Sequence, residues 1–296
     1  MKPPISSNDH GTFHECLLLA AVCDVRNFSM LQAHIDEHIV SSLTLKEHNQ
    51  KLGKRKLEYM NDTRERATKI FLKSLTKSME KGEELKYAIK STGDGFLVAV
   101  EVWDFDSKDP PPLLESKFPE LWTRRAWALA EALWVLHEDS KVTNRREKQR
   151  TLGGLTSAFL KDFATELGLS KKDYTERGYF RVPGALAMGS GTITPAHGNE
   201  RGDAYGNPVN IAFRLCEQAG KFNDKNDRTK QISPPVLLDR RVGRLLASFK
   251  PARSAWVVLP LDEVTLKGIE EKWCYALQKR KQRRRRKLAT KSAKAK

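Results

Sequence analysis

The sequence predicts an α/β sandwich of the ferredoxin-like type, for three reasons. β-rich segments alternate with amphipathic helical segments along the 296 residues. Two of the β-rich segments flank a Gly-Asp-Gly turn and therefore predict a hairpin. The chain contains no internal repeat, and its 39% hydrophobic residues suffice for one core with insertions rather than a repeat array.

The N-terminal half is expected to contain a strand, two helices and the hairpin. Residues 1–13 are polar and carry prolines, which indicates a flexible arm. The apolar run Cys16–Asp24 ends in an acidic residue, as a buried strand does when it presents a side chain at its end. Residues 29–78 have apolar positions at helical spacing, so we expect two helices, the second strongly basic. Residues 85–103 predict the hairpin, with Asp94 at its tip.

The second half begins after a proline run at 110–112, which breaks the chain. Tryptophan and leucine recur at helical spacing over 122–136, which predicts a helix packed on the core. A glycine-rich stretch at 189–206 indicates a loop that lets the backbone approach a ligand. The other expected elements are helices at 155–167, 212–219 and 235–246 and strands at 180–188, 256–264 and 272–277.

The net charge of +16 is concentrated at the C-terminal end of the chain. Residues 279–296 contain eleven Lys or Arg and no acidic residue, and subtracting these eleven leaves +5 for the rest. Such a run is typical of a disordered basic tail. We expect it to make at most weak, salt-sensitive contacts with nucleic acid or anionic lipid.

The apolar runs and the cysteines of the sequence indicate the cellular compartment of the protein. The longest apolar stretch, Leu17–Val22, is too short for a membrane span, and no secretory signal is present. We therefore expect a cytoplasmic protein that is not transmembrane. Its four cysteines are scattered without a CxxC pair, so neither a zinc site nor a structural disulfide is expected.

Two aspartates are the candidate centre of the chemistry. Asp24 ends a predicted strand, and Asp94 is at the tip of the predicted hairpin. If these strands are neighbours, the two carboxylates point at one place, where they can hold two hard cations as two-metal phosphoryl-transfer sites do. The segment after Asp24 is expected to pass from strand to helix, and free backbone N–H groups there favour phosphate.

Four sequence blocks, spread in order over the chain, carry recognisable motifs. They read CDVRNFS, KSTGDGFLVAV, GALAMGSGTIT followed by GDAYGNPVNIAFRL, and VTLKGIEEKWCYAL. In this order the blocks resemble those of class III adenylate and guanylate cyclases, although each block alone is a weak signal. The resemblance implies the class III cyclase catalytic fold over residues 14–278, with helical insertions near 44–80 and 104–150.

The resemblance also implies a role for each matched position. Two divalent cations, Mn²⁺ or Mg²⁺, would be bound by Asp24, Asp94 and the carbonyl of Val25. The phosphates would be held by the backbone of Arg26, Asn27 and Phe28 and by Lys267. Asn210 would orient the ribose, Arg214 would stabilise charge on the α-phosphate, and Lys90 and Asp203 would read the base.

In class III cyclases the active site is shared across a dimer. One chain supplies the metal-binding carboxylates, and its partner supplies the base readers, the asparagine and the arginine. Because this chain carries both sets, the resemblance implies a homodimer with two composite sites for a nucleoside triphosphate. A monomer would then be nearly inactive.

The base is left open by the residues themselves, because a lysine donor and an aspartate acceptor suit all four bases. Asp24 and Asp94 are 70 residues apart, and the second insertion adds three tryptophans. In these features the chain resembles stand-alone bacterial pyrimidine cyclases that make cyclic UMP or cyclic CMP as anti-phage signals, the inserted side chains narrowing the pocket. Cyclic UMP is favoured. An adenylate cyclase and an inactive nucleotide- or RNA-binding module are the alternatives.

Overall fold

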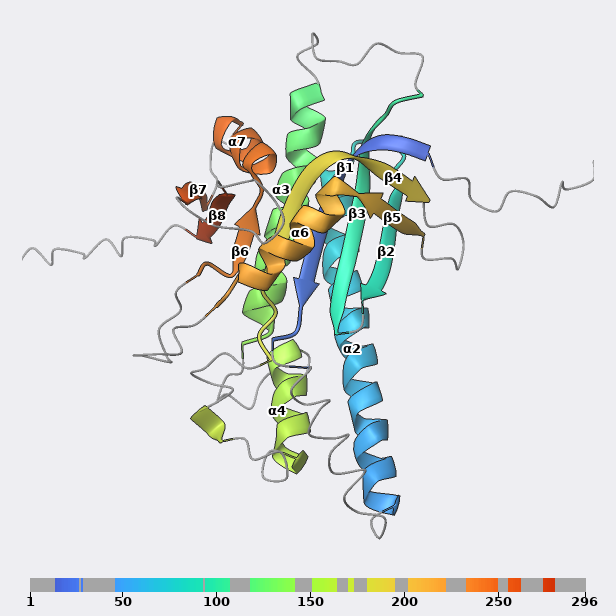
Figure 1. The fold of residues 1–296 in the computed structure, drawn as a ribbon, viewed down its shortest axis with the longest axis vertical. Coiled ribbons are helices and arrows are strands. Elements are labelled where there is room, and N and C mark those ends of the chain that lie inside the picture. The colour runs from blue at the N-terminus through green and yellow to red at the C-terminus, as the bar shows by residue number, and fades with distance from the viewer. Residues whose placement is uncertain are drawn as a thin grey trace, which may run out of the picture.

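An eight-stranded sheet forms the centre of the fold (Figure 1). The computed structural model describes residues 14–26, 28, 46–92, 94–106, 118–141, 151–163, 170–172, 180–194, 202–221, 233–249, 255–261 and 274–279. Within these residues, helices cover both faces of the sheet, which confirms the predicted α/β class.

The central strand β1 (His14–Asp24) is buried over most of its length, as its continuous apolar sequence predicts. It pairs antiparallel with β3 (Gly95–Asp104) on one side and with β4 (Gly184–Thr194) on the other. β2 (Tyr87–Thr92) pairs with β3 and completes the predicted hairpin. Beyond β4 the order continues through β6 (Val236–Leu238), β8 (Cys274–Lys279) and β7 (Trp256–Leu261), and the short strand β5 (Asp203–Gly206) also pairs with β4.

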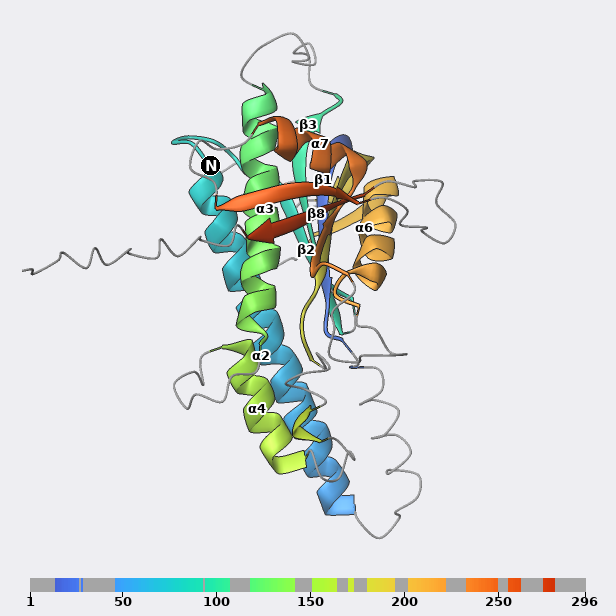
Figure 2. The same ribbon diagram turned by 90° about the vertical axis from the view of Figure 1, so that its left-hand side faces the viewer.

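Helices form a layer on each side of the sheet. α2 (Lys46–Ser78), α3 (Phe118–Asp139) and α7 (Arg240–Ser248) pack on one face, and α6 (Asn207–Gln218) packs on the other (Figure 2). α4 (Leu152–Phe163) lies against α2. α2 and α4 both run beyond the end of the sheet, so the helical layer is longer than the sheet that it covers (Figures 1 and 2).

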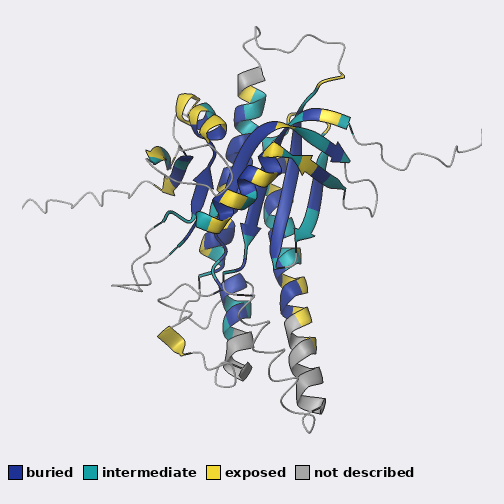
Figure 3. Ribbon diagram, viewed as in Figure 1, coloured by how far each residue is buried: buried dark blue, intermediate teal, exposed yellow. Residues whose placement is uncertain are grey.

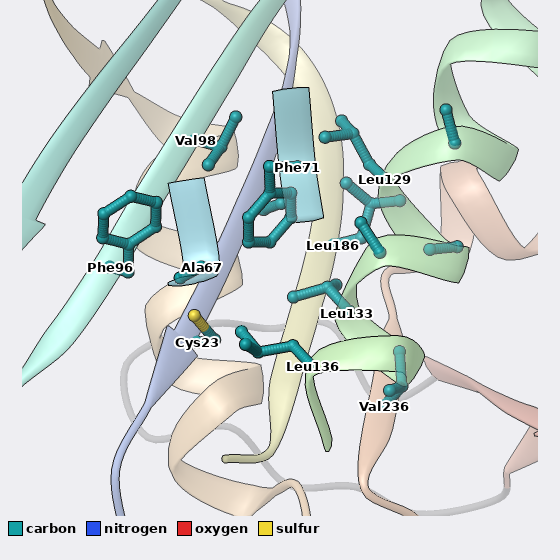
Figure 4. Packing of buried hydrophobic residues seen from close by; sticks show 14 of the residues in the cluster. Cys23, Ala67, Phe71, Phe96, Val98, Leu129, Leu133, Leu136, Leu186 and Val236 are labelled. Carbon is teal, nitrogen blue, oxygen red and sulfur yellow. The ribbon is translucent and has the colours of Figure 1, made fainter. Parts of the chain in front are cut away.

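Side-chain alternation along the strands creates two separate cores. On β1, Leu19 and Cys23 belong to the core under α2 and α3, whereas Leu18 and Val22 belong to the core under α6. Figure 3 shows that the central strands are buried along most of their length. In the larger core, Phe71 of α2 lies between the strands and the leucines of α3 (Figure 4).

Most of the predicted elements are confirmed, but several differ in kind or extent. The glycine-rich stretch at 189–206, expected to be a loop, begins as the continuation of β4 to Thr194 and ends as β5, which pairs with it. The helix expected over 235–246 is the strand β6 followed by α7. Asp239 separates them, because its carboxylate accepts a hydrogen bond from Val242 N at 2.7 Å and caps the helix. Of the two helices expected over 29–78, a single one over Lys46–Ser78 is described. β4 begins at Gly184 rather than at residue 180, where Phe180 has a left-handed φ of 61° and Pro183 lacks an N–H.

The expected insertions contribute to the main core. Both α2, within 44–80, and α3, within 104–150, bury apolar side chains against the sheet. The arm 1–13 and residues 280–296 of the basic tail lie outside the described residues. No helix of the described part combines the length and the apolar character needed to cross a membrane.

Candidate active site

Asp24 and Asp94 meet at one end of the central strands. β1 ends at Asp24, whose register partner on β3 is Gly95. Val25 N donates a hydrogen bond to the carbonyl of Asp94 at 3.3 Å, which ties the hairpin tip to the end of β1. A Cβ on Gly95 would lie 2.9 Å from the carbonyl oxygen of Cys23 and 3.2 Å from Asp24 Oδ1. The close approach of the two strands therefore requires glycine at this position.

The two carboxyl groups interact directly. Burial and the neighbouring negative charge of Asp94 raise the pKa of Asp24 from its ordinary value of 3.8 to about 6, while Arg26 opposes the shift. Two carboxylates that repel each other in a partly buried place form an all-oxygen donor set for a hard divalent cation. Val25, which follows Asp24 directly, lines the same pocket. The residues present therefore fit the Mn²⁺ or Mg²⁺ that the sequence motifs imply.

A small pocket of about 20 Å³ opens beside the carboxylates, enough for a water molecule or an ion. One of its walls comes from α2, through Met60, Thr63, Arg64 and Ala67. These residues are one helical turn apart, so they share a face of the helix. Sequence reasoning missed them, because their spacing predicts a buried face but not what that face covers.

The predicted phosphate-binding segment is engaged within the chain. The backbone N–H of Arg26 donates to the carbonyl of Arg181 at 2.9 Å, and that of Phe28 donates to Val25 at 3.2 Å. The guanidinium of Arg26 donates to carbonyls at the end of α6, including Glu217 O at 3.2 Å. To bind phosphate, the backbone N–H groups of Arg26 and Phe28 would have to give up these hydrogen bonds and donate to phosphate oxygens instead. Asn27 and Lys267 lie outside the described residues.

Asn210 and Arg214 lie on the outer face of α6. The helix buries Ile211, Ala212 and Leu215 against the sheet, and the two predicted catalytic residues point the other way. Arg214 is exposed and forms an ion pair with Glu217 at 3.1 Å. Neither residue lines the pocket beside Asp24 and Asp94. Within one chain, therefore, these side chains and the carboxylates are not brought together.

The two predicted base readers are in direct contact. Lys90 Nζ of β2 donates to Asp203 Oδ2 of β5 at 2.6 Å, although the residues are 113 positions apart. Burial raises the pKa of Asp203, but hydrogen bonds from Lys90 and Tyr205 outweigh it and lower that pKa. The Tyr205 hydroxyl donates to the same oxygen at 2.6 Å, and Lys90 Nζ lies 5.3 Å from the centre of its ring. Tyr205 is thus a third member that the motif match did not single out.

The three tryptophans of α3 lie on the opposite side of the sheet from this cluster. Trp122, Trp127 and Trp134 pack with the larger core. Lys90 instead lies on the same side of β2 as Ala88, which belongs to the core under α6. Within one chain the sheet therefore separates these three tryptophans from the base readers, and the expectation that inserted side chains narrow the base pocket stays a prediction.

Comparison with protein-family models and with curated proteins finds no match. Among solved structures, the adenylyl cyclase CyaB from P. aeruginosa is similar with a TM-score of 0.48 and 13% identity, over 92% of this chain and 98% of that one. The guanylyl cyclase Cya2 is similar with a TM-score of 0.45 and 11% identity, over 92% and 96%. Adenylate cyclases from Trypanosoma brucei reach 0.42 and 13%, over 90% of each chain. At such low identity and TM-score, these similarities assign neither activity nor substrate to this chain.

Proposed function

We propose that this chain is a nucleotidyl cyclase, which converts a nucleoside triphosphate into a 3′,5′-cyclic nucleotide and pyrophosphate. The supporting observation is the Asp24–Asp94 pair, two carboxylates 70 residues apart in sequence that interact at the end of neighbouring strands. In the reaction the ribose 3′-oxygen forms a bond to the α-phosphorus, the bond to the bridging oxygen of pyrophosphate breaks, and the 3′-hydroxyl proton leaves.

Asp24, Asp94 and the carbonyl of Val25 hold the divalent cations in this proposal. When bound, two such ions promote loss of the 3′-hydroxyl proton and neutralise the triphosphate and its leaving group. Arg26, Asn27, Phe28 and Lys267 bind the phosphates. Asn210 orients the ribose, and Arg214 stabilises the charge that develops on the α-phosphate.

A second copy of the chain completes the site. The outward position of Asn210 and Arg214 on α6 leaves them unable to act on nucleotide held at Asp24 and Asp94 of their own chain. Arg214 is exposed and forms an ion pair with the neighbouring Glu217, which it can exchange at low cost, since a surface ion pair contributes about 1 kcal/mol or less. A homodimer with two composite sites is the arrangement that we propose.

Lys90 and Asp203 read the base, with a pyrimidine as the proposed substrate and cyclic UMP preferred over cyclic CMP. Tyr205 supports this choice, because its ring lies over Lys90 and its hydroxyl occupies Asp203 Oδ2. Both contacts reduce the space for a purine at the pair. By resemblance to the stand-alone bacterial pyrimidine cyclases, the product would serve as an anti-phage signal. Adenine, which also suits a lysine donor and an aspartate acceptor, is the alternative.

The test incubates the full chain with Mn²⁺ and each of ATP, GTP, CTP and UTP, and identifies cyclic products by mass spectrometry. We expect cyclic UMP. Asp94→Asn should lower its formation at least about 100-fold, because the ions contribute several kcal/mol to the transition state. Asp106→Asn, at an exposed acid beyond the other end of β3, is the matched control and should keep full activity.

Each alternative has its own outcome in this assay. Cyclic AMP alone would retain the mechanism and overturn the pyrimidine proposal. No product from any triphosphate, with a folded and dimeric protein, would favour a nucleotide- or RNA-binding module. An Asp94→Asn variant as active as the wild type would refute the two-metal site.

A further inference from the structure

A second group of metal-ligating side chains lies at the opposite end of β1 from Asp24. His14 and Cys16 are two residues apart on β1, and Glu101 is on the neighbouring strand β3. A ring nitrogen of the histidine, Sγ of the cysteine and a carboxylate oxygen of the glutamate all lie within 4.8 Å of one another. The three residues come together because alternate residues of a strand share a face.

The group is largely shielded from solvent but not sealed. Cys16 is fully buried, and the side chains of His14 and Glu101 are 20% and 11% exposed. An ion could therefore enter beside the histidine. The two oxygens of Glu101 have different partners: Oε2 contacts His14 Nε2, whereas Oε1 lies 3.3 Å from Lys86 Nζ. Lys86 therefore engages one oxygen of the carboxylate, and an ion bound at the other oxygen would replace its contact with His14.

The backbone around Glu101 is fixed. A β-bulge interrupts the β1–β3 register between Leu17 and Leu18, next to Cys16. Such bulges redirect side chains. The N–H of Glu101 donates to Lys86 O at 3.0 Å, and its carbonyl accepts a hydrogen bond from the guanidinium of Arg125. These bonds fix the stretch of backbone that carries the Glu101 carboxylate.

We propose that His14, Cys16 and Glu101 bind one zinc ion, at a site that is independent of the proposed cyclase centre. Nitrogen, sulfur and oxygen donors together suit Zn²⁺, which binds them at about 2.0–2.3 Å in a tetrahedral arrangement. That geometry places the donor atoms about 3.3–3.8 Å apart. Binding would bring the three groups, which now lie within 4.8 Å of one another, to that spacing. Water, or Asp104 opposite Cys16 in the register, supplies the fourth ligand.

Zinc binding here exchanges a proton for the ion. Burial and the charges of Glu101 and Asp104 raise the pKa of the Cys16 thiol to about 12, so the thiol is protonated in the metal-free protein. The S–H bond breaks as the S–Zn bond forms, and the proton goes to solvent. The ion would replace the histidine–glutamate contact and join β1 to β3 at the end opposite the Asp24–Asp94 pair.

The expectation of no zinc site rested on the absence of a CxxC pair. This proposal uses a different pattern, a histidine and a cysteine two residues apart on a strand, with a glutamate 85 positions after the cysteine. Such a group of ligands forms no recognisable sequence motif, because two strands that are far apart in the sequence must pair before the ligands meet.

The test uses Co²⁺ as a spectroscopic substitute for Zn²⁺ on the full chain after treatment with a chelator. A thiolate-to-cobalt charge-transfer band in the near ultraviolet is expected at about one equivalent, and Zn²⁺ should abolish it. Cys16→Ser should remove the band, and His14→Gln should weaken Co²⁺ binding more than about 100-fold, since even loss of an outer partner costs 10–100-fold. Cys274→Ser, which removes another buried cysteine, should leave the band unchanged.

Two further variants test whether Lys86 competes with the metal ion for Glu101, and whether the proposed zinc site is independent of Asp24. Lys86→Met removes a competing cation from Glu101, so it should strengthen Co²⁺ binding several-fold, an effect that a merely structural role of the lysine would not produce. Asp24→Asn should keep the band even where cyclase activity is lost, so failure of the cyclase proposal leaves this one intact. No thiolate band in the wild type, or a band that survives Cys16→Ser in a protein folded by circular dichroism, would overturn the zinc site.

Discussion

His137 is a buried titratable side chain between α3 and the segment that leads into β4. It is 2% exposed, and its Nδ1 lies 3.3 Å from the carbonyl of Val182. Burial lowers its pKa from 6.5 to about 4, and the positive charges of Lys141 and Arg181 act in the same direction. The folded protein therefore binds this proton more weakly than the unfolded chain does.

The lowered pKa of His137 predicts that the folded protein becomes less stable as the pH falls. The stabilisation is present above pH 6.5 and is lost as the pH falls from 6.5 towards 4, because the unfolded histidine gains a proton first. Between pH 7.5 and 4.5 this difference corresponds to roughly 2–3 kcal/mol. His137→Gln should lose correspondingly less free energy of unfolding over that interval, as measured by urea denaturation. Equal losses in the two proteins would contradict the assignment to His137.

Some residues of the candidate site could be predicted from the sequence, and others could not. Asp24 and Asp94 could be predicted, because a strand end and a hairpin tip are local patterns. Arg64 and Tyr205 could not, because their positions depend on where α2 and β5 pack. The sequence around a residue on a helix face, or around a tyrosine on a short strand, is the same whether the residue borders a functional site or only packs against the core.

The β2–β3 hairpin is the element that places Asp94 against Asp24. Gly95→Ala would bring a methyl group 2.9 Å from Cys23 O and force β3 away from the end of β1. We expect a loss of about 1–3 kcal/mol in stability. We also expect weaker Mn²⁺ binding by the folded protein, measured by calorimetry.

Gly243→Ala is the matched control for this variant. A Cβ at Gly243 of α7 would overlap the ring of Tyr275 on β8, so this change should destabilise the fold by a similar mechanism. It lies outside the pocket of the aspartates, and Mn²⁺ affinity of the folded protein should be unchanged. If both variants weaken Mn²⁺ binding equally, the hairpin has no special part in the site.

Elements with strong periodicity could be predicted, and short ones could not. The pattern of tryptophan and leucine identifies α3, and the continuous apolar run identifies β1. β6 has only three residues, Val236–Leu238, and β5 has four, so neither is long enough for a period to emerge. Each exists because a neighbouring strand of the sheet offers backbone partners to a short segment.

At the scale of the whole molecule, the proposed composite site predicts that two inactive variants rescue each other. Asp94→Asn lacks a metal ligand, and Arg214→Ala lacks the side chain on the outer face of α6. When the two variants are unfolded, mixed in equal amounts and refolded together, half of the dimers should be heterodimers, and each heterodimer should have one intact site. The mixture should therefore reach about a quarter of wild-type activity. No recovery, with subunit exchange verified by differently tagged chains, would contradict shared sites.

The position of β1 in the sheet also determines when the protein can fold. Its partners on β3 and β4 are about 80 and 170 residues further along the chain, as Leu19 opposite Val100 and Met188 illustrates. Closing such long loops is slow, because their entropy is lost before the contacts compensate for it. During synthesis the apolar run Leu17–Val22 can pair with β3 only after about a third of the chain has been made and with β4 only after about two thirds, and it is exposed to aggregation until then.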